Sequence, residues 1–202
     1  MDLVTLTSKD AAILRRPTKK FYFERRLDGT YHRMVKIMET NKGCGLAATQ
    51  VGISERFFIG DIDGETKLII NPRITKTWGL YVNTEGCLSI PGKVFHVPRY
   101  RSIEVQYQDA LGELHTYSTN CEKTSAIFQH EIDHLDGILI DDYCTHKSKK
   151  CYCNYVKHRQ PLAVEDIMRA RELKEKLSFG DLYEKVYEKY LKSYKLDLPK
   201  SV

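Results

Sequence analysis

Apolar residues recur at regular intervals through the first 140 residues, and their spacing predicts two helices with strands between them. Thr30–Thr40 carries apolar residues at helical spacing. Thr124–Asp136 has the pattern of a second helix, with Gly137 after it as a stop signal. A hairpin position is predicted at Ala110-Leu111-Gly112. Five segments bounded by turn residues are predicted as strands: Phe57–Ile62, Lys67–Asn71, Ile74–Trp78, Ser102–Asp109 and Glu113–Ser118.

The order of these elements favours an α+β fold. The predicted strands follow one another directly, whereas strands and helices alternate in doubly wound α/β proteins. At 202 residues and 42% hydrophobic composition, the chain is long enough for one domain with a complete core. No apolar run approaches the roughly 20 residues of a membrane-spanning helix. We therefore expect one globular domain over residues 1–142 and no membrane partner.

Residues 143–202 differ from the rest of the chain in charge. They hold 14 Lys and Arg against 8 Asp and Glu, whereas the preceding residues hold 18 against 19. The excess of positive charge therefore lies entirely in this segment. Helical spacing over Val164–Leu177 and Asp181–Tyr194, interrupted at Gly180, predicts two helices. We expect a basic, mostly helical C-terminal extension.

His130 and His134 are the strongest chemical signal in the sequence. They are four residues apart, so a helix places them one turn apart on one face. One divalent metal can bind both imidazoles at that spacing, with Glu131 beside them as a base. The pattern also arises by chance, so the third ligand decides which chemistry is present. Zinc peptidases with this motif take that ligand downstream, and Leu135–Ile140 contains no histidine.

Two further motifs lie upstream of the histidine pair. They are Gly43-Cys44-Gly45-Leu46-Ala47-Ala48-Thr49-Gln50 and Glu85-Gly86-Cys87-Leu88-Ser89. Together with Gln129-His130-Glu131-Ile132-Asp133-His134, they resemble the three signature motifs of peptide deformylases, in the same order. The resemblance covers roughly residues 10–142. On these motifs the chain is identified as a member of that family.

The resemblance implies a fold, a reaction and a role for each motif residue. The fold is α+β, with antiparallel β-sheets packed around a central metal-bearing helix. The implied reaction removes the formyl group from the N-terminal formylmethionine of new polypeptides and releases formate. The implied metal ligands are Cys87, His130 and His134, with a fourth position left for water. Glu131 is the implied base, and the Gln50 side chain and the Leu88 backbone N–H would bind the formyl oxygen.

The implied cofactor is one divalent metal ion. A thiolate with two imidazoles accepts Fe(II), Zn(II), Ni(II) or Co(II), so the ligand set does not select among them. The resemblance implies Fe(II) in the cell, with zinc as a stable and less active replacement. The six cysteines form no secreted-type disulfide framework, and a thiolate ligand favours a reducing compartment. We expect a cytoplasmic protein.

The substrate pocket is expected to include Gly45, with Cys44, Asn83, Ile127 and His130 as candidates for its walls. Gly45 would let the substrate backbone approach the loop closely. Many members of the family carry apolar residues near the methionine pocket where this chain has Glu122-Lys123-Thr124-Ser125. The side-chain preference of the pocket therefore remains open.

Three charged residues in or near the motifs each have two alternative interpretations. Glu85 and Arg99 are expected either to support the metal ligands or to form an ordinary ion pair. Asp133 is expected to support the site or to be solvated, and it is not expected to bind the metal.

The C-terminal extension has two alternative interpretations. Its basic residues could dock to ribosomal RNA through backbone phosphates, or the extension could be a solvated helical segment packed on the catalytic domain. A second, structural zinc site is conceivable at Cys144, His146, Cys151, Cys153 and His158, although their spacing fits no standard zinc motif.

Three classes of function remain open from the sequence. The first is a deformylase acting on N-formylmethionyl peptides, and the second is a metallopeptidase of the His-Glu-x-x-His type. The third is a catalytically altered or silent protein that kept the fold. Cys87, Gln50 and Glu131 are all present, which favours the first.

Overall fold

The computed structural model describes residues 2–24 and 27–143. Within these residues there are two α-helices, five strands and three short 3₁₀ helices. The predicted tail helices and the conceivable zinc site lie outside the described residues. In chain order the elements are η1 (Ala11–Arg15), α1 (Asp28–Thr40), β1 (Gly45–Ala47), η2 (Ala48–Val51), β2 (Phe57–Ile62), β3 (Glu65–Cys87), β4 (Ile90–Gln108), β5 (Leu114–Thr119), α2 (Glu122–Leu135) and η3 (Ile140–Tyr143).

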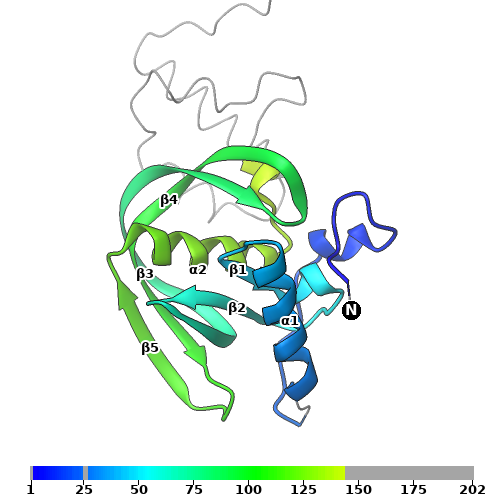
Figure 1. Ribbon diagram of the computed structural model, residues 1–202. Coiled ribbons are helices and arrows are strands. Elements are labelled where there is room, and N and C mark those ends of the chain that lie inside the picture. Colours follow the sequence, from blue (N-terminus) through cyan, green and yellow to red (C-terminus); the bar gives the residue numbers. More distant parts are fainter. Residues whose placement is uncertain (1, 25–26, 144–202) are drawn as a thin grey trace, which may run out of the picture.

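The five strands form one antiparallel sheet in the order β1-β2-β3-β4-β5. β3 and β4 are the longest, with 23 and 19 residues. Figure 1 shows this pair curving around α2, so that one bent sheet covers the helix from more than one side. The antiparallel α+β arrangement expected from the sequence is confirmed, with a single continuous sheet in place of separate ones.

The predicted break between Lys67–Asn71 and Ile74–Trp78 is wrong, because both segments belong to β3. Asn71 has a φ of 50°, and the pairing with β4 shifts register between Ile70 and Arg73. An irregularity of this kind bends a strand without ending it. Residues 71–73, between the two predicted strands, therefore lie at a bend within one strand.

Both predicted helices are present. α1 and α2 each begin two residues before the predicted start, and α2 ends at Leu135. The predicted stop at Gly137 is confirmed: its φ is 74°, and its N–H donates to the carbonyl oxygen of His134 at 3.2 Å. A Cβ at this position would also lie 2.8 Å from the Arg15 carbonyl carbon. Glycine is therefore required both by the backbone conformation and by the close approach of the N-terminal segment.

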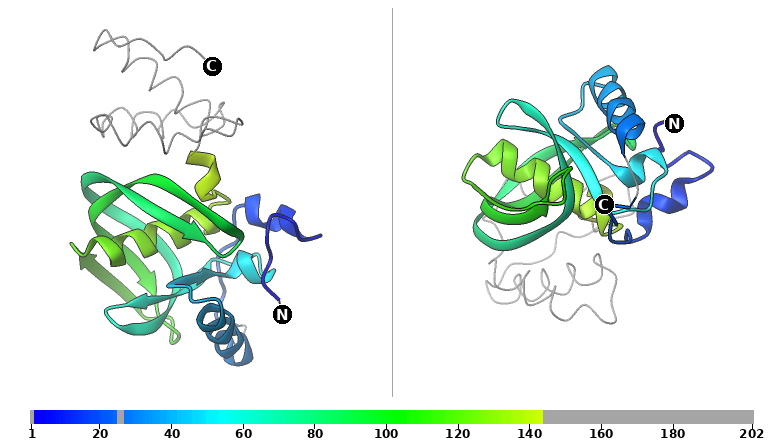
Figure 2. Two further views of the ribbon diagram at one scale, coloured as in Figure 1. Left: turned by 45° about the horizontal axis from the view of Figure 1, so that its top comes forward. Right: turned by 90° about the horizontal axis from the view of Figure 1, so that it is seen from below.

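Alternation along β2 divides the core into two parts. Phe58 and Ile62 pack against α2, in a cluster with Phe128 and Ile132. Phe57 and Ile59 face the other way and pack with Met34 and Met38 of α1. Figure 2 accordingly shows α1 and α2 on opposite sides of β1 and β2. This sheet face fixes the position of α2, which carries the histidine pair.

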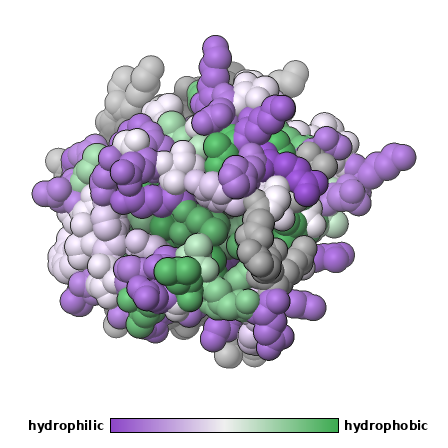
Figure 3. All heavy atoms as spheres, turned by 60° about the horizontal axis from the view of Figure 1, so that its bottom comes forward, coloured by the Kyte–Doolittle hydropathy of each residue, from purple (hydrophilic) through white to green (hydrophobic). Residues whose placement is uncertain are grey.

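The surface mixes polar and apolar side chains. Figure 3 shows apolar side chains gathered in the middle of one face, with hydrophilic side chains around them. The large apolar residues exposed in the described part of the chain are Leu6, Tyr22, Phe23, Trp78, Val94, Leu111 and Leu114. Within that part, neither helix is long and apolar enough to cross a bilayer.

Candidate metal centre

Helix α2 carries His130 and His134 on one face, as their spacing predicts. Their ring centroids are 5.0 Å apart, and the side chain of His134 is almost fully buried. The helix is amphipathic, and its apolar residues Ile127, Phe128 and Ile132 anchor it against the sheet. The two imidazoles are therefore held by a packed helix and not by a loop.

Cys87 reaches this pair from the end of β3. The chain reverses at Leu88 and Ser89, and Cys87 pairs with Ile90 at the end of the hairpin. The Cys87 sulfur lies 3.2 Å from Nε2 of His134. One donor atom from each of Cys87, His130 and His134 lies within 4.8 Å of the other two. The structure thus brings Cys87 to a histidine pair that lies more than 40 positions later in the sequence.

The chemistry of these three donors fits a divalent transition metal. A soft thiolate with two imidazoles is typical of zinc and iron sites. Nδ1 of His130 lies 2.9 Å from Oε2 of Glu85, which leaves Nε2 as the nitrogen available on the Cys87 side. Nδ1 of His134 is buried and has no hydrogen-bond partner among the described residues. Burial, together with the positive charges of His130 and Arg99, lowers the pKa of His134 well below its ordinary value, so this imidazole is neutral.

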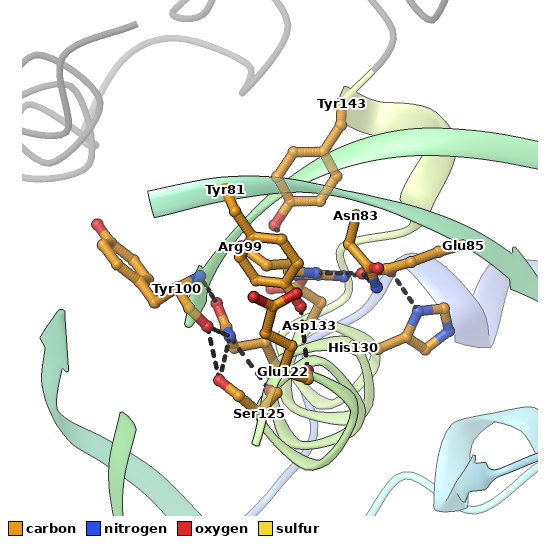
Figure 4. A network of polar contacts seen from close by, with 11 residues as sticks. Tyr81, Asn83, Glu85, Arg99, Tyr100, Glu122, Ser125, His130, Asp133 and Tyr143 are labelled. Carbon is orange, nitrogen blue, oxygen red and sulfur yellow. Dashed lines mark hydrogen bonds and ion pairs between the residues drawn. The ribbon is translucent and has the colours of Figure 1, made fainter. Parts of the chain in front are cut away.

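Glu85 links the candidate ligands to a buried ion network, which Figure 4 shows. Its carboxylate accepts hydrogen bonds from Nε and Nη2 of Arg99, at 2.7 and 2.8 Å. Nη1 of Arg99 donates to Oδ2 of Asp133 at 2.6 Å, and the Tyr143 hydroxyl donates to the same oxygen at 2.7 Å. The network therefore ties β3, β4, α2 and η3 together behind His130.

The network strongly shifts the pKa values of Glu85 and His130. Burial works to raise the pKa of Glu85, but the Arg99 guanidinium outweighs it and holds this pKa far below its ordinary value. Burial also works to lower the pKa of His130, and contacts with Cys87 and Glu85 reverse this effect and raise it well above the usual range. Glu85 is thus a permanent anion beside His130.

Glu131 lies on the cleft side of α2, directly against Gly45. A Cβ at residue 45 would lie only 2.4 Å from Oε1 of Glu131, so a side chain there would displace the carboxylate. Oε2 of Glu131 is buried and has no hydrogen-bond partner among residues 2–24 and 27–143. Burial raises the pKa of Glu131 to about 7, and the positive charge of His130 only partly opposes this. The carboxyl is therefore poised to exchange a proton near neutral pH.

Gln50 is held in a fixed orientation by the turn that follows β1. Its Oε1 accepts a hydrogen bond from the Ala47 backbone N–H at 2.8 Å. Its Nε2 is consequently directed at the site, 3.2 Å from Oγ of Ser89 and 3.7 Å from the Cys87 sulfur. Ser89 in turn donates to the Val4 carbonyl oxygen at 2.7 Å. The amide is thus fixed as a donor next to the candidate ligands.

A cleft of about 840 Å³ opens onto these groups. All of the residues expected around the substrate line it: Cys44, Gly45, Asn83, Leu88 and Ile127. Glu122 and Lys123 line it as well. Thr124 and Ser125 do not, since both are buried and the Ser125 hydroxyl donates to the Tyr100 carbonyl oxygen at 2.6 Å. Of the four residues expected near the pocket at the start of α2, the structure therefore brings only the first two to the cleft.

Some residues around the site were not predicted or were predicted loosely. Ser89 and Tyr143 were not singled out, although both bond to groups of the site. Asp133 is buried in the network and is not solvated. Glu85 and Arg99 form an ion pair and also support His130, so the two alternatives for them are compatible.

Comparison with known proteins gives a consistent result. The family model for polypeptide deformylase matches residues 3–150. A peptide deformylase of Symbiobacterium thermophilum is 47% identical over 115 residues, which are 55% of this chain and 52% of the relative. One from Thermotoga petrophila is 38% identical over 139 residues, covering 66% of this chain and 81% of the relative.

Solved structures agree with the sequence relatives. The crystal structure of peptide deformylase from Thermotoga maritima matches with a TM-score of 0.65 and 36% identity, over 70% of this chain and 95% of that one. A peptide deformylase from Synechococcus elongatus in complex with actinonin matches with a TM-score of 0.64 and 35% identity, over 71% and 78%. The chain therefore belongs to the peptide deformylase family and is a hydrolase that removes the N-formyl group from new polypeptides.

Proposed function

We propose that Cys87, His130 and His134 hold one divalent metal ion for this reaction. The observation that carries the proposal is the convergence of a cysteine sulfur and two imidazoles within 4.8 Å, with Cys87 and His130 lining the cleft. The contact of His130 with Glu85 supports it, because histidine ligands usually bind a carboxylate through their second nitrogen. The bound ion would supply Lewis-acid activation of a water molecule and of the formyl carbonyl.

The protein groups around that ion have separate roles in the proposed reaction. Glu131 takes a proton as water adds to the formyl carbon, and it returns a proton to the amine nitrogen when the C–N bond breaks. Its position beside Gly45 and its buried oxygen without a hydrogen-bond partner support this role. The Gln50 amide and the Leu88 backbone N–H donate to the formyl oxygen as negative charge develops there. The products are formate and a free amino terminus.

We propose Fe(II) as the metal in the cell, with Zn(II), Ni(II) and Co(II) able to occupy the same donors. Protein prepared without oxygen, or loaded with nickel, should turn over much faster than the zinc form. Equal rates for all three preparations would contradict the choice of iron.

The direct test is formate release from formyl-Met-Ala-Ser. The intact protein should hold one metal ion per chain and release formate, while Glu131→Ala should keep the metal and lose turnover. Cys87→Ser should lose the metal. Full deformylase turnover in Cys87→Asp, which keeps an oxygen ligand of the peptidase kind, would contradict the proposed thiolate site.

We also propose a role for the basic residues 143–202 and a location for the protein. Their net positive charge would dock the enzyme to ribosomal RNA, where formylated chains emerge in the cytoplasm. The alternative is a solvated extension packed on the catalytic domain over residues 1–142. A chain truncated after Tyr143, which keeps the buried network intact, separates the two, since docking requires that it lose co-sedimentation with ribosomes.

A further inference from the structure

The exposed charges that line the cleft are mostly positive. They are Lys42, Lys93, Glu122 and Lys123. The other charged groups of the cleft, Glu85, His130 and Glu131, lie deeper and belong to the site already described. The rim is therefore a separate group of mostly positive charges, and it would face any part of a substrate that extends beyond the formylated residue.

Partners outside the cleft neutralise two of the four rim charges. The Glu122 carboxylate forms an ion pair with Arg101, and the Lys123 ammonium lies 3.0 Å from Oδ2 of Asp61. Neither Lys42 nor Lys93 has an ion-pair partner among the described residues. Once each pair is counted as neutral, two uncompensated positive charges remain on the rim.

Both lysines line the cleft at irregular positions of the backbone. Lys42 follows α1 with a φ of 55°, a conformation that glycine or asparagine adopts at lower cost. Its neighbour Gly43 packs so closely that a Cβ there would lie 2.9 Å from Cδ1 of Leu88. Lys93 follows Gly92 in the hairpin between β3 and β4, where the ladder passes from Gly86–Val94 to Cys87–Ile90. Three residues of β4, Lys93 among them, have no counterpart on β3, and such bulges redirect side chains.

A carboxylate is the group that these two lysines would bind. The cleft of about 840 Å³ lies in the upper part of the range for small-ligand sites, so it has room for more than a formylated methionine. A peptide whose formyl group reaches the candidate metal centre would extend its following residues past the rim. We infer that the cleft selects formylated peptides with an acidic side chain in the residues after the first, and that Lys42 and Lys93 are the specificity-determining residues. This inference rests on the proposed function of the cleft.

The test compares three amidated peptides: formyl-Met-Ala-Asp, formyl-Met-Ala-Asn and formyl-Met-Ala-Lys. Amidation removes the terminal carboxylate, and the Asp and Asn peptides differ in charge at nearly equal shape. At low ionic strength we expect kcat/KM to be about fivefold higher for the Asp than for the Asn peptide, since one exposed ion pair contributes a factor of about two to five. The Lys peptide should be the slowest. The preference should lie in KM, because the contact forms equally in the ground and transition states.

Charge reversal at both lysines should remove this preference. In Lys42→Glu/Lys93→Glu the Asp-to-Asn ratio should fall below one, and each single change to Gln should lower it by about half. In about 1 M salt, where the Debye length is about 3 Å, the ratio of the unaltered protein should approach one. The matched control is Lys36→Glu, which makes the same change on an exposed residue of α1 away from the cleft, and its ratio should equal that of the unaltered protein.

The possible outcomes separate the inferred charge preference from the proposed deformylase reaction. A ratio of one in the unaltered protein, or an unchanged ratio in the double variant, would overturn the inference while leaving the deformylase reaction intact. A fall in the ratio for Lys36→Glu of the same size would overturn it too, because net charge alone would then explain the preference. Absence of formate release from all three peptides would instead contradict the proposed function.

Discussion

Glu131 and Asp133 are buried carboxylates two residues apart on α2, and their surroundings are opposite. Asp133 accepts hydrogen bonds from Arg99 and Tyr143 on the network side of the helix. Glu131 faces the cleft, and its Oε2 has no hydrogen-bond partner within the described part of the chain. Both carboxylates are almost fully removed from water. The comparison indicates that burial alone does not set the state of a buried acid, because the partners within reach differ.

The strongest test of this comparison is Glu131→Gln. We expect turnover to fall by about 10³-fold, since a general base contributes about 10² to 10⁴. The melting temperature should stay the same or rise, because a buried acid without a full set of partners is replaced by a neutral amide of equal size. Formate release measures the turnover, and thermal unfolding of the same preparation measures the melting temperature. A variant that loses both activity and stability would show that Glu131 is structural as well.

Asp133→Asn should have the reverse effect. Removing one charge from the buried network leaves Arg99 with Glu85 as its one remaining carboxylate, and breaking such pairs costs about 3 kcal/mol of unfolding free energy. Denaturant unfolding would measure this loss. Activity per folded molecule should change much less than in Glu131→Gln, and a larger loss of activity than of stability would contradict the contrast between the two acids.

Gly45→Ala tests whether the position of the Glu131 carboxylate in the cleft matters for activity. The added Cβ would lie 2.4 Å from Oε1 of Glu131, so the carboxylate must move. We expect kcat/KM to fall by about 10²-fold, the typical cost of a misplacement of about 1 Å in an active site. The steric control is Gly86→Ala, whose Cβ would meet its nearest atom at 3.8 Å and should leave the unfolding free energy unchanged.

Tyr143→Phe should have the smallest effect. The change removes the hydrogen bond from the Tyr143 hydroxyl to Asp133, while the hydrogen bond from Arg99 to Asp133 stays. We therefore expect a loss of about 1 kcal/mol in unfolding free energy. Tyr117→Phe is the matched control, because its hydroxyl donates to the exposed Asp63 carboxylate, where water can replace the bond. Equal losses in the two variants would show that the buried network gains nothing from its burial.

The sequence predicts the local part of this site better than the assembled part. Both helices follow from apolar spacing, and the distance between His130 and His134 follows from helix geometry. Cys87 was assigned by resemblance to a family motif, since nothing in the local pattern directs a cysteine at the end of a strand towards a helix that begins 35 residues later.

The long strands β3 and β4 were only partly predicted, for a physical reason. Gly79, Pro91, Gly92 and Pro98 interrupt the alternation that marks strands, and cross-strand pairing overrides these local preferences. Arg99 was expected either to support the metal ligands or to form an ordinary ion pair, and the sequence did not predict its burial. Its burial depends on two acids from different elements, which no local pattern could reveal.

The position of Cys87 at the tip of the β3–β4 hairpin has a mechanical consequence. The hairpin tip and α2 are joined near this point through side chains 47 residues apart in the sequence. An ion held by Cys87, His130 and His134 would act as a cross-link that closes this loop, much as a disulfide does, and would restrict the unfolded chain most strongly there. Metal loading would then protect the backbone of the hairpin from hydrogen exchange before it changed the rest of the sheet.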